Sequence, residues 1–224
     1  MVAIEPGLRE RKKRQTRHLI LEAAARLFAK RGFESVTVAE IARSADVSEV
    51  TVFNYFPSKE DLVFGGMEFF EERLIAAVRE RESGESVLAA FQRPVLDGCK
   101  NIAVDENAER IARAGALINS SPALQVRERE VVARYTQLLA EALAEAARVT
   151  PEDVEVQGVA GALMSVHRAL VIYVRTKALA GRRGPKLATE ARAQATRAFA
   201  RIEGGLATYA IRKARAIALP VATP

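Results

Sequence analysis

Four polar side chains are spaced to share the outward side of one short helix: Glu49, Thr51, Asn54 and Tyr55. They lie within the stretch from Thr37 to Lys59, TVAEIARSADVSEVTVFNYFPSK. Val52 and Phe56 are four residues apart and share the opposite, buried side. Carboxylate, hydroxyl and amide groups on an exposed helix can hydrogen-bond to base edges in the major groove of DNA. The spacing therefore predicts a DNA reader.

Two capped helices and a tight turn are expected to hold these side chains in place. Thr37 and Glu40 have the spacing of a capping box at the start of the first helix. The turn is expected at Asp46, because aspartate tolerates the backbone angles that tight turns require. Ser48 is expected to cap the second helix, and Pro57 to end it, because the residue before a proline avoids the helical conformation.

The rest of the chain predicts an all-α fold, because no strand pattern is present. Ser58 and Asp61 form another capping-box pair and predict one long helix from Ser58 to about Arg81. Further helices are expected over residues 86–101, 106–119, 122–148, 152–180 and 187–215, with Pro122 and Pro151 in first turns. No uncharged apolar run reaches the roughly 18 residues of a membrane span, so none is expected.

Residues from about Arg17 to Leu62 resemble the N-terminal domain of the TetR family of bacterial transcriptional regulators. The matching pieces are Ile20, Ala23-Ala24, Leu27-Phe28, Gly32-Phe33, Thr37-Val38, Ile41-Ala42, Ala45-Asp46-Val47-Ser48, Thr51-Val52-Phe53, Tyr55-Phe56 and Ser58-Lys59-Glu60-Asp61-Leu62. They cover about a fifth of the chain. The resemblance implies a helix-turn-helix DNA-binding domain with a basic N-terminal arm, residues 1–56, and a larger helical ligand-binding and dimerisation domain, residues 57–224.

By match to the family's motif, the DNA-binding residues are expected to be Arg17, Thr37, Ala39, Ser48, Glu49, Thr51, Phe53, Asn54, Tyr55 and Lys59. Lys59 is expected to hold a phosphate. Phe53 replaces a tyrosine common in the family, so a phosphate contact through that hydroxyl is missing. The arm from Arg9 to Lys13 is either a second phosphate contact or a solvated tail.

The resemblance also implies that the last two long helices pair with their copies in a second subunit. The side chains expected at this interface are Leu163, Leu170, Ala195, Phe199, Ile202 and Leu206. A dimer suits a short reader, because two readers address a palindrome. Packing within one monomer is the alternative interpretation of the same residues.

Large side chains on three of the expected helices are candidates for a ligand cavity: Phe64, Met67, Phe91, Met164 and His167. The same side chains would equally well fill a solid core, and His167 fits a core histidine better than a ligand contact. The expected ligand is a small hydrophobic or amphipathic molecule.

Composition and motifs argue against an enzyme, a cofactor or a metal site. His18 and His167 are the only histidines, Cys99 is the only cysteine, and no catalytic or phosphate-binding motif occurs. The net charge of +6 suits a polyanionic partner. The sequence therefore predicts a cytoplasmic, homodimeric repressor that binds palindromic operator DNA and is released by a ligand. A ligand-independent regulator, an activator and a helical lipid carrier are the alternatives.

Overall fold

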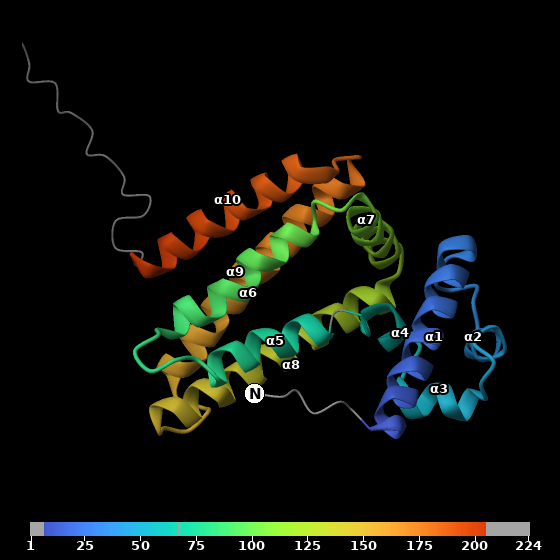
Figure 1. The fold of residues 1–224 in the computed structure, drawn as a ribbon, viewed down its shortest axis with the longest axis horizontal. Helices are drawn as coiled ribbons and strands as arrows, with labels where there is room; N and C mark the ends of the chain where they lie inside the picture. The colour runs from blue at the N-terminus through green and yellow to red at the C-terminus, as the bar shows by residue number, and fades with distance from the viewer. Residues whose placement is uncertain (1–6, 67, 205–224) are drawn as a thin grey trace, which may run out of the picture.

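The computed structural model describes residues 7–66 and 68–204, and all regular elements within these ranges are α-helices. The first three are α1 (Leu8–Arg31), α2 (Val38–Ser44) and α3 (Glu49–Tyr55). They form a unit at one end of the molecule, which we call the reader (Figure 1). The predicted all-α fold with an N-terminal helix-turn-helix unit is therefore confirmed.

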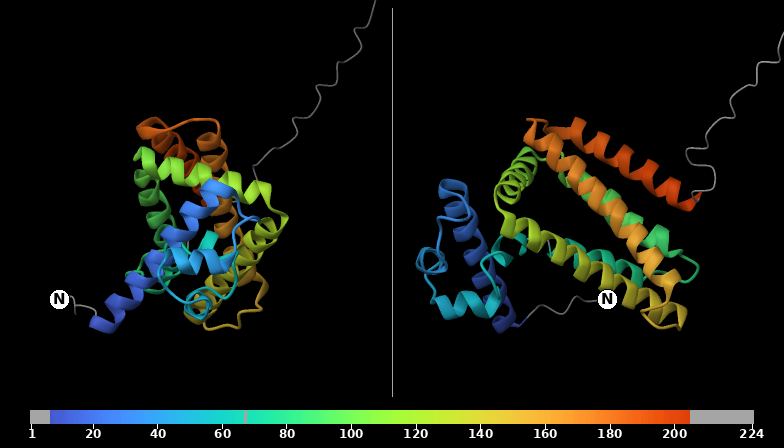
Figure 2. Two further views of the ribbon diagram at one scale, coloured as in Figure 1. Left: turned by 90° about the vertical axis from the view of Figure 1, so that its right-hand side faces the viewer. Right: turned by 180° about the vertical axis from the view of Figure 1, so that it is seen from behind.

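The other helices of the described chain form what we call the body: α4 (Asp61–Phe64), α5 (Glu68–Arg79), α6 (Val87–Asn101), α7 (Asp105–Ser120), α8 (Pro122–Ala147), α9 (Val154–Leu179) and α10 (Gly184–Glu203). Helix α5 runs beside α8, whereas α6 and α10 lie along α9 (Figures 1 and 2). Helix α7 packs against both α8 and α9 and so joins the two sides of the body. The short α4 lies between the reader and the rest of the body (Figure 1).

The predicted caps of the reader are present. The Thr37 hydroxyl accepts from the backbone N–H of Glu40, and the Glu40 carboxylate accepts from the N–H of Thr37 at 2.9 Å. Asp46 has a φ of 55°, in the left-handed region that its turn requires. The Ser48 hydroxyl accepts from the N–H of Thr51 at 3.0 Å and begins α3. Local sequence signals thus set the ends of both short helices.

The predicted single helix from Ser58 to Arg81 is wrong, because the chain forms α4 and α5 with Gly65 and Gly66 between them. The Ser58–Asp61 capping pair does form. The backbone N–H of Ser58 donates to the Asp61 carboxylate, and the backbone N–H of Asp61 donates to the Ser58 hydroxyl. Packing explains the glycine at the break: a Cβ on Gly65 would lie 2.6 Å from the ring of Phe56. Gly65 therefore lets the end of α4 pack directly against the reader.

Several other helix ends differ from the prediction. Helix α1 begins at Leu8, so the basic arm is an exposed helical segment and not an irregular tail. Asp153 caps α9, which places Pro151 before that helix and not in its first turn. Helix α10 begins at Gly184 and is described to Glu203, so the predicted end near residue 215 lies outside the described residues.

Helix α9 is unusually apolar. Within the described residues it is the one helix that is long and apolar enough to cross a membrane, judged by length and composition alone. Only 28% of its most apolar window is buried. The absence of a membrane span therefore stays a prediction, and α9 carries more apolar surface than the body covers.

Candidate DNA-binding interface

A small apolar core fixes the orientation of the reader helices. Ile20 and Phe28 of α1, Ile41 of α2 and Val52 of α3 are each at most 4% exposed. Phe56 follows α3 and is 1% exposed. Because these five side chains come from all parts of the reader, α3 cannot turn about its axis without opening the core.

Polar contacts add a second connection between α1 and α2. Arg26 donates to the Ser44 hydroxyl at 2.9 Å, and Arg31 forms an ion pair of 2.7 Å with Glu40. Hydrogen bonds from Arg31 and from Thr37 lower the pKa of the Glu40 carboxyl to about 2. Glu40, the residue that completes the capping box, thus remains ionised and holds α2 to the end of α1.

The outward face of α3 consists of Glu49, Val50, Phe53 and Asn54, which are all exposed. Three of these four were predicted from the sequence, and Val50 was missed. Its position was available in the spacing, because Val50 and Asn54 are four residues apart and share a face. Polar residue type alone was therefore too narrow a criterion for an outward position on α3.

Thr51 and Tyr55 point less fully outward than the sequence suggested. Thr51 is half-buried, and its hydroxyl lies 2.8 Å from that of Ser48. Tyr55 is half-buried and packs against the core. Both side chains therefore lie at the border of the outward face.

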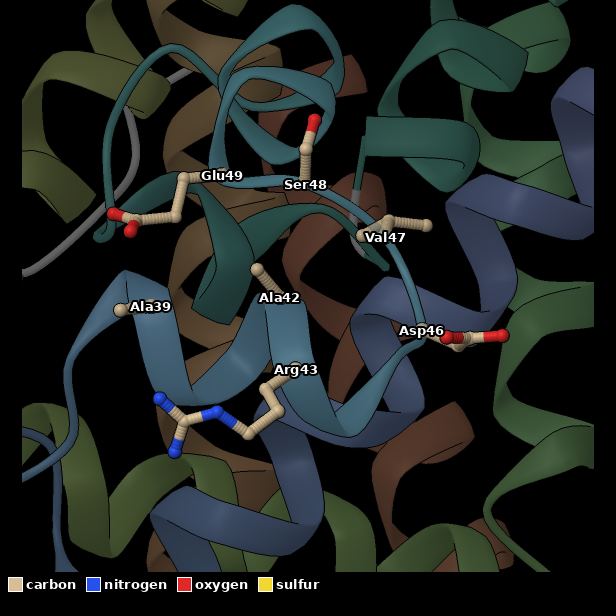
Figure 3. Close-up of a pocket in the computed structure, with 7 residues that line it drawn as sticks. All are labelled: Ala39, Ala42, Arg43, Asp46, Val47, Ser48 and Glu49. Atoms are coloured by element: carbon tan, nitrogen blue, oxygen red, sulfur yellow. The ribbon is translucent and has the colours of Figure 1, made fainter.

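A shallow groove lies between α2 and α3, with Ala39 of α2 opposite Glu49 of α3 (Figure 3). Arg43 also lines this groove and is exposed. The sequence prediction included Ala39 and Ser48, which are present here, and missed Arg43. Arg43 adds a positive charge suited to guanine or phosphate.

Arg17 and Lys59 lie on aromatic rings of the reader. The Arg17 guanidinium is 4.9 Å from the centre of the Phe56 ring, and Lys59 Nζ is 4.2 Å from the centre of the Phe33 ring. Lys59 also donates to the backbone carbonyl of Glu34 at 3.5 Å. These contacts hold two cationic groups in place on the reader. A phosphate that binds there would therefore meet side chains that are already ordered.

Helix α8 makes one polar contact with the reader and one with α4, the short helix next to the reader. Ser121, the residue that caps α8, donates from its hydroxyl to Glu34 at 2.7 Å. Arg127 forms an ion pair of 2.7 Å with Asp61, whose side chain is only 5% exposed. Movement of α8 therefore pulls on both the α1–α2 connection and the start of α4.

Sequence comparison assigns this reader to a family. The profile of the bacterial regulatory proteins of the tetR family matches residues 20–64, and that of the MftR C-terminal domain matches residues 85–178, so the two together cover more than half of the chain. The chain belongs to the TetR family of bacterial transcriptional regulators. Members of the TetR family are regulators and not enzymes, as the sequence predicted.

Individual TetR-family relatives match over parts of their length. The transcriptional regulator TcmR of Streptomyces glaucescens is 38% identical over 86 residues, which are 38% of each chain. The MftR protein of Mycobacterium tuberculosis is 26% identical over 132 residues, 56% of this chain and 66% of MftR. The chain spans only 26% to 38% of TcmR and two further curated regulators.

A solved structure of the TetR fold matches most of the chain. NalD of Pseudomonas aeruginosa superposes with a TM-score of 0.54 at 20% identity, over 84% of this chain and 96% of NalD. This likeness supports the fold, including the helical body that follows the reader.

The body of this TetR-family chain contains a narrow cavity of about 30 Å³ between α4, α5, α8 and α9. Three of the five residues predicted for a ligand site line it: Phe64, Met164 and His167. His167 is 8% exposed, its Nδ1 has no hydrogen-bond partner within the described structure, and burial lowers its pKa to about 4. The cavity therefore combines several apolar side chains and a neutral imidazole with the charged residues Glu71, Glu128 and Arg168.

Phe91, also predicted at the ligand site, does not line this cavity. Its ring packs against that of Phe199 at 6.2 Å between centres, and both residues are fully buried. The sequence placed Phe91 on the inner side of α6 but gave no information about which helix covers it. Met67 lies outside the described residues.

Four of the six predicted interface residues are buried inside this chain's own core: Leu163, Leu170, Ala195 and Phe199. Their side chains therefore do not reach the surface. Ile202 is half-buried, and Leu206 lies outside the described residues. Helical periodicity identified one face of each helix, and the structure shows that α6, α7, α8 and the pairing of α9 with α10 cover those faces.

Proposed function

We propose that this chain is a homodimeric transcriptional repressor, which binds a palindromic operator and is released from it by a small ligand. The observation that carries the proposal is the outward face of α3, which a capped helix and a buried core hold in one orientation. The cytoplasm is its expected location, because bacterial DNA lies there.

The DNA contacts are expected to come from two sets of side chains. Glu49, Phe53 and Asn54 form most of the outward face of α3 and would meet base edges in a major groove. Arg17, Lys59 and the exposed basic segment at the start of α1 would bind phosphates. Residues 1–56 and 57–224 remain our proposed division, with Gly65 and α4 at the contact between the two parts.

Ligand release follows from the size of the cavity. About 30 Å³ is far below the roughly 300 Å³ or more of a typical ligand pocket, so a ligand must separate the surrounding helices. Phe64 ends α4, the Ser121 hydroxyl at the start of α8 donates to Glu34 of the reader, and Arg127 of α8 is paired with Asp61 of α4. A ligand that opens the cavity would therefore displace the reader, provided that it binds the opened state more tightly.

A dimer is favoured by the uncovered face of α9. Gly158, Ser165, Ile172 and Leu179 recur every seven residues, and all four are exposed. Ala169 and Thr176 lie between them and are also exposed. This stripe of small and apolar residues, beside which Arg168 is also exposed, suits close packing against a second copy. Such packing would set two readers about one DNA turn, roughly 34 Å, apart.

The decisive experiment is selection of bound duplexes from a random DNA library by the purified protein. The proposal predicts a recovered site with two inverted halves, bound by a dimer. Native mass spectrometry of protein purified from its own host should then reveal a bound small molecule that lowers affinity for this site. Failure to enrich any sequence would reject the DNA-binding function, and a tight complex that no bound molecule weakens would reject ligand release.

A further inference from the structure

We infer that α3 recognises the 5-methyl groups of thymine through Val50 and Phe53. The inference rests on the proposed DNA-binding function and specifies what the reader recognises. It concerns two side chains that polar residue type would not have selected, one of which, Val50, the family motif did not indicate either.

Exposure and position support this role. Val50 is 69% exposed and Phe53 is 47% exposed, and they are three residues apart on one helix face. The opposite face of α3 is closed, because Val52 is 1% exposed. Since the Thr51 hydroxyl is bonded to Ser48, apolar atoms make up much of what α3 presents outward.

The chemistry of the major groove assigns these side chains a partner. Every base pair displays hydrogen-bond donors or acceptors there, and thymine adds the one apolar group, its C5 methyl. An apolar side chain placed over any other edge would remove water from polar groups without replacing their hydrogen bonds. Val50 and Phe53 therefore favour thymine at the base pairs that they cover.

The neighbouring polar residue agrees with this preference. Asn54 is exposed on the same face, four residues after Val50. An asparagine amide can bond both N6 and N7 of adenine. The outward face of α3 is thus suited to a half-site in which consecutive A·T pairs present thymine methyls and an adenine edge.

The test uses the full-length protein and the operator that it selects from random DNA. Each thymine of a half-site is replaced in turn by deoxyuridine, which removes only the methyl group. At the thymines read by Val50 and Phe53 the affinity should fall about fourfold, the factor that corresponds to roughly 0.8 kcal/mol for one buried carbon group. At the other positions the affinity should stay the same.

Variants identify the residue that reads each methyl. Val50→Ala should bind the thymine and deoxyuridine forms of its own position equally, and Phe53→Ala should do so at a different position. Val50→Thr, which keeps the shape of valine, provides a second variant. Val104→Ala is the matched control, because Val104 is 53% exposed but precedes α7 in the body. It should retain the methyl dependence of the original protein.

A further replacement separates the methyl group from the polar edge of the base. A thymine·adenine pair is exchanged for cytosine·guanine and for 5-methylcytosine·guanine, and the methylated pair should recover about fourfold in affinity. The inference is overturned if deoxyuridine is tolerated at every position, or if both alanine variants keep the original methyl dependence. If no DNA sequence is enriched at all, the proposed function itself fails.

Discussion

Different kinds of interaction stabilise the reader and the body internally, and this difference decides how much of each part can be predicted from its sequence. The reader contains two short helices, α2 and α3, whose starts are set by contacts three residues apart, such as Thr37 with Glu40 and Ser48 with Thr51. The body consists of longer helices whose faces are covered by residues far away in sequence, such as Phe91 by Phe199. Local chemistry is readable from the chain, whereas long-range packing is not.

The largest expected effect concerns the uncovered face of α9. Ala169→Glu would place a charge from each subunit at the proposed interface, and burying a charge without a partner costs several kcal/mol. We expect monomers by sedimentation. Ala146→Glu, at an exposed position of α8, is the matched control and should remain a dimer. A dimer of unchanged stability in the Ala169→Glu variant would place the interface elsewhere.

The ion pair that joins α8 to α4, the helix next to the reader, gives the next largest effect. Arg127→Ala leaves the Asp61 carboxylate, 5% exposed, without its cation, and loss of one partner from a buried pair costs about 3–5 kcal/mol. Urea unfolding should show a loss at or somewhat below this range, because Arg127 itself is 30% exposed. Glu130→Ala removes the second, exposed ion-pair partner of Arg127 and should cost less than about 1 kcal/mol. Equal losses for both variants would argue against the connection.

The buried histidine predicts a pH dependence of the body. Burial lowers the pKa of His167 from 6.5 to about 4, so the unfolded chain takes up a proton first as the pH falls. Relative to His167→Phe, the protein should lose about 3 kcal/mol of stability between pH 6.5 and 4, and nothing more below that. The difference between the two proteins at pH 7.5 is the reference, because His167 is neutral in both states there. A constant difference from pH 7.5 to 4 would show that His167 is not buried as a neutral group.

The smallest effect concerns a local cap of the reader. Thr37→Ala removes the hydroxyl that begins α2 and should destabilise the protein by about 1 kcal/mol in thermal or urea unfolding. Thr37→Ser retains the hydroxyl and should recover most of the loss. If serine is no better than alanine, the capping bond does not stabilise the reader.

The sequence predicted the reader closely and the body only in outline. The three caps, the turn at Asp46 and the outward positions of Glu49 and Asn54 follow from spacing, whereas Phe53 was indicated by the family motif. Spacing also placed Thr51 and Tyr55 outward, and both are half-buried. The break at Gly65 depends on the Phe56 ring, which a helical pattern does not show. In the body, periodicity located the helices, but the burial of Phe199 depends on α6, a helix about 100 residues earlier in the chain.

The central claim is that the outward face of α3 binds DNA, and the most direct measurement is operator affinity after a negative charge is introduced on that face. Phe53→Glu is compared with Phe69→Glu, because Phe69 of α5 is also an exposed phenylalanine, 69% exposed against 47% for Phe53. Like-charge contact with the phosphate-rich groove should lower the affinity of Phe53→Glu at least 100-fold, on the order of 3 kcal/mol. Phe69→Glu should stay within about twofold of the original protein, as expected for a surface change away from the interface. Binding of the selected operator by a folded Phe53→Glu protein with undiminished affinity would contradict the account.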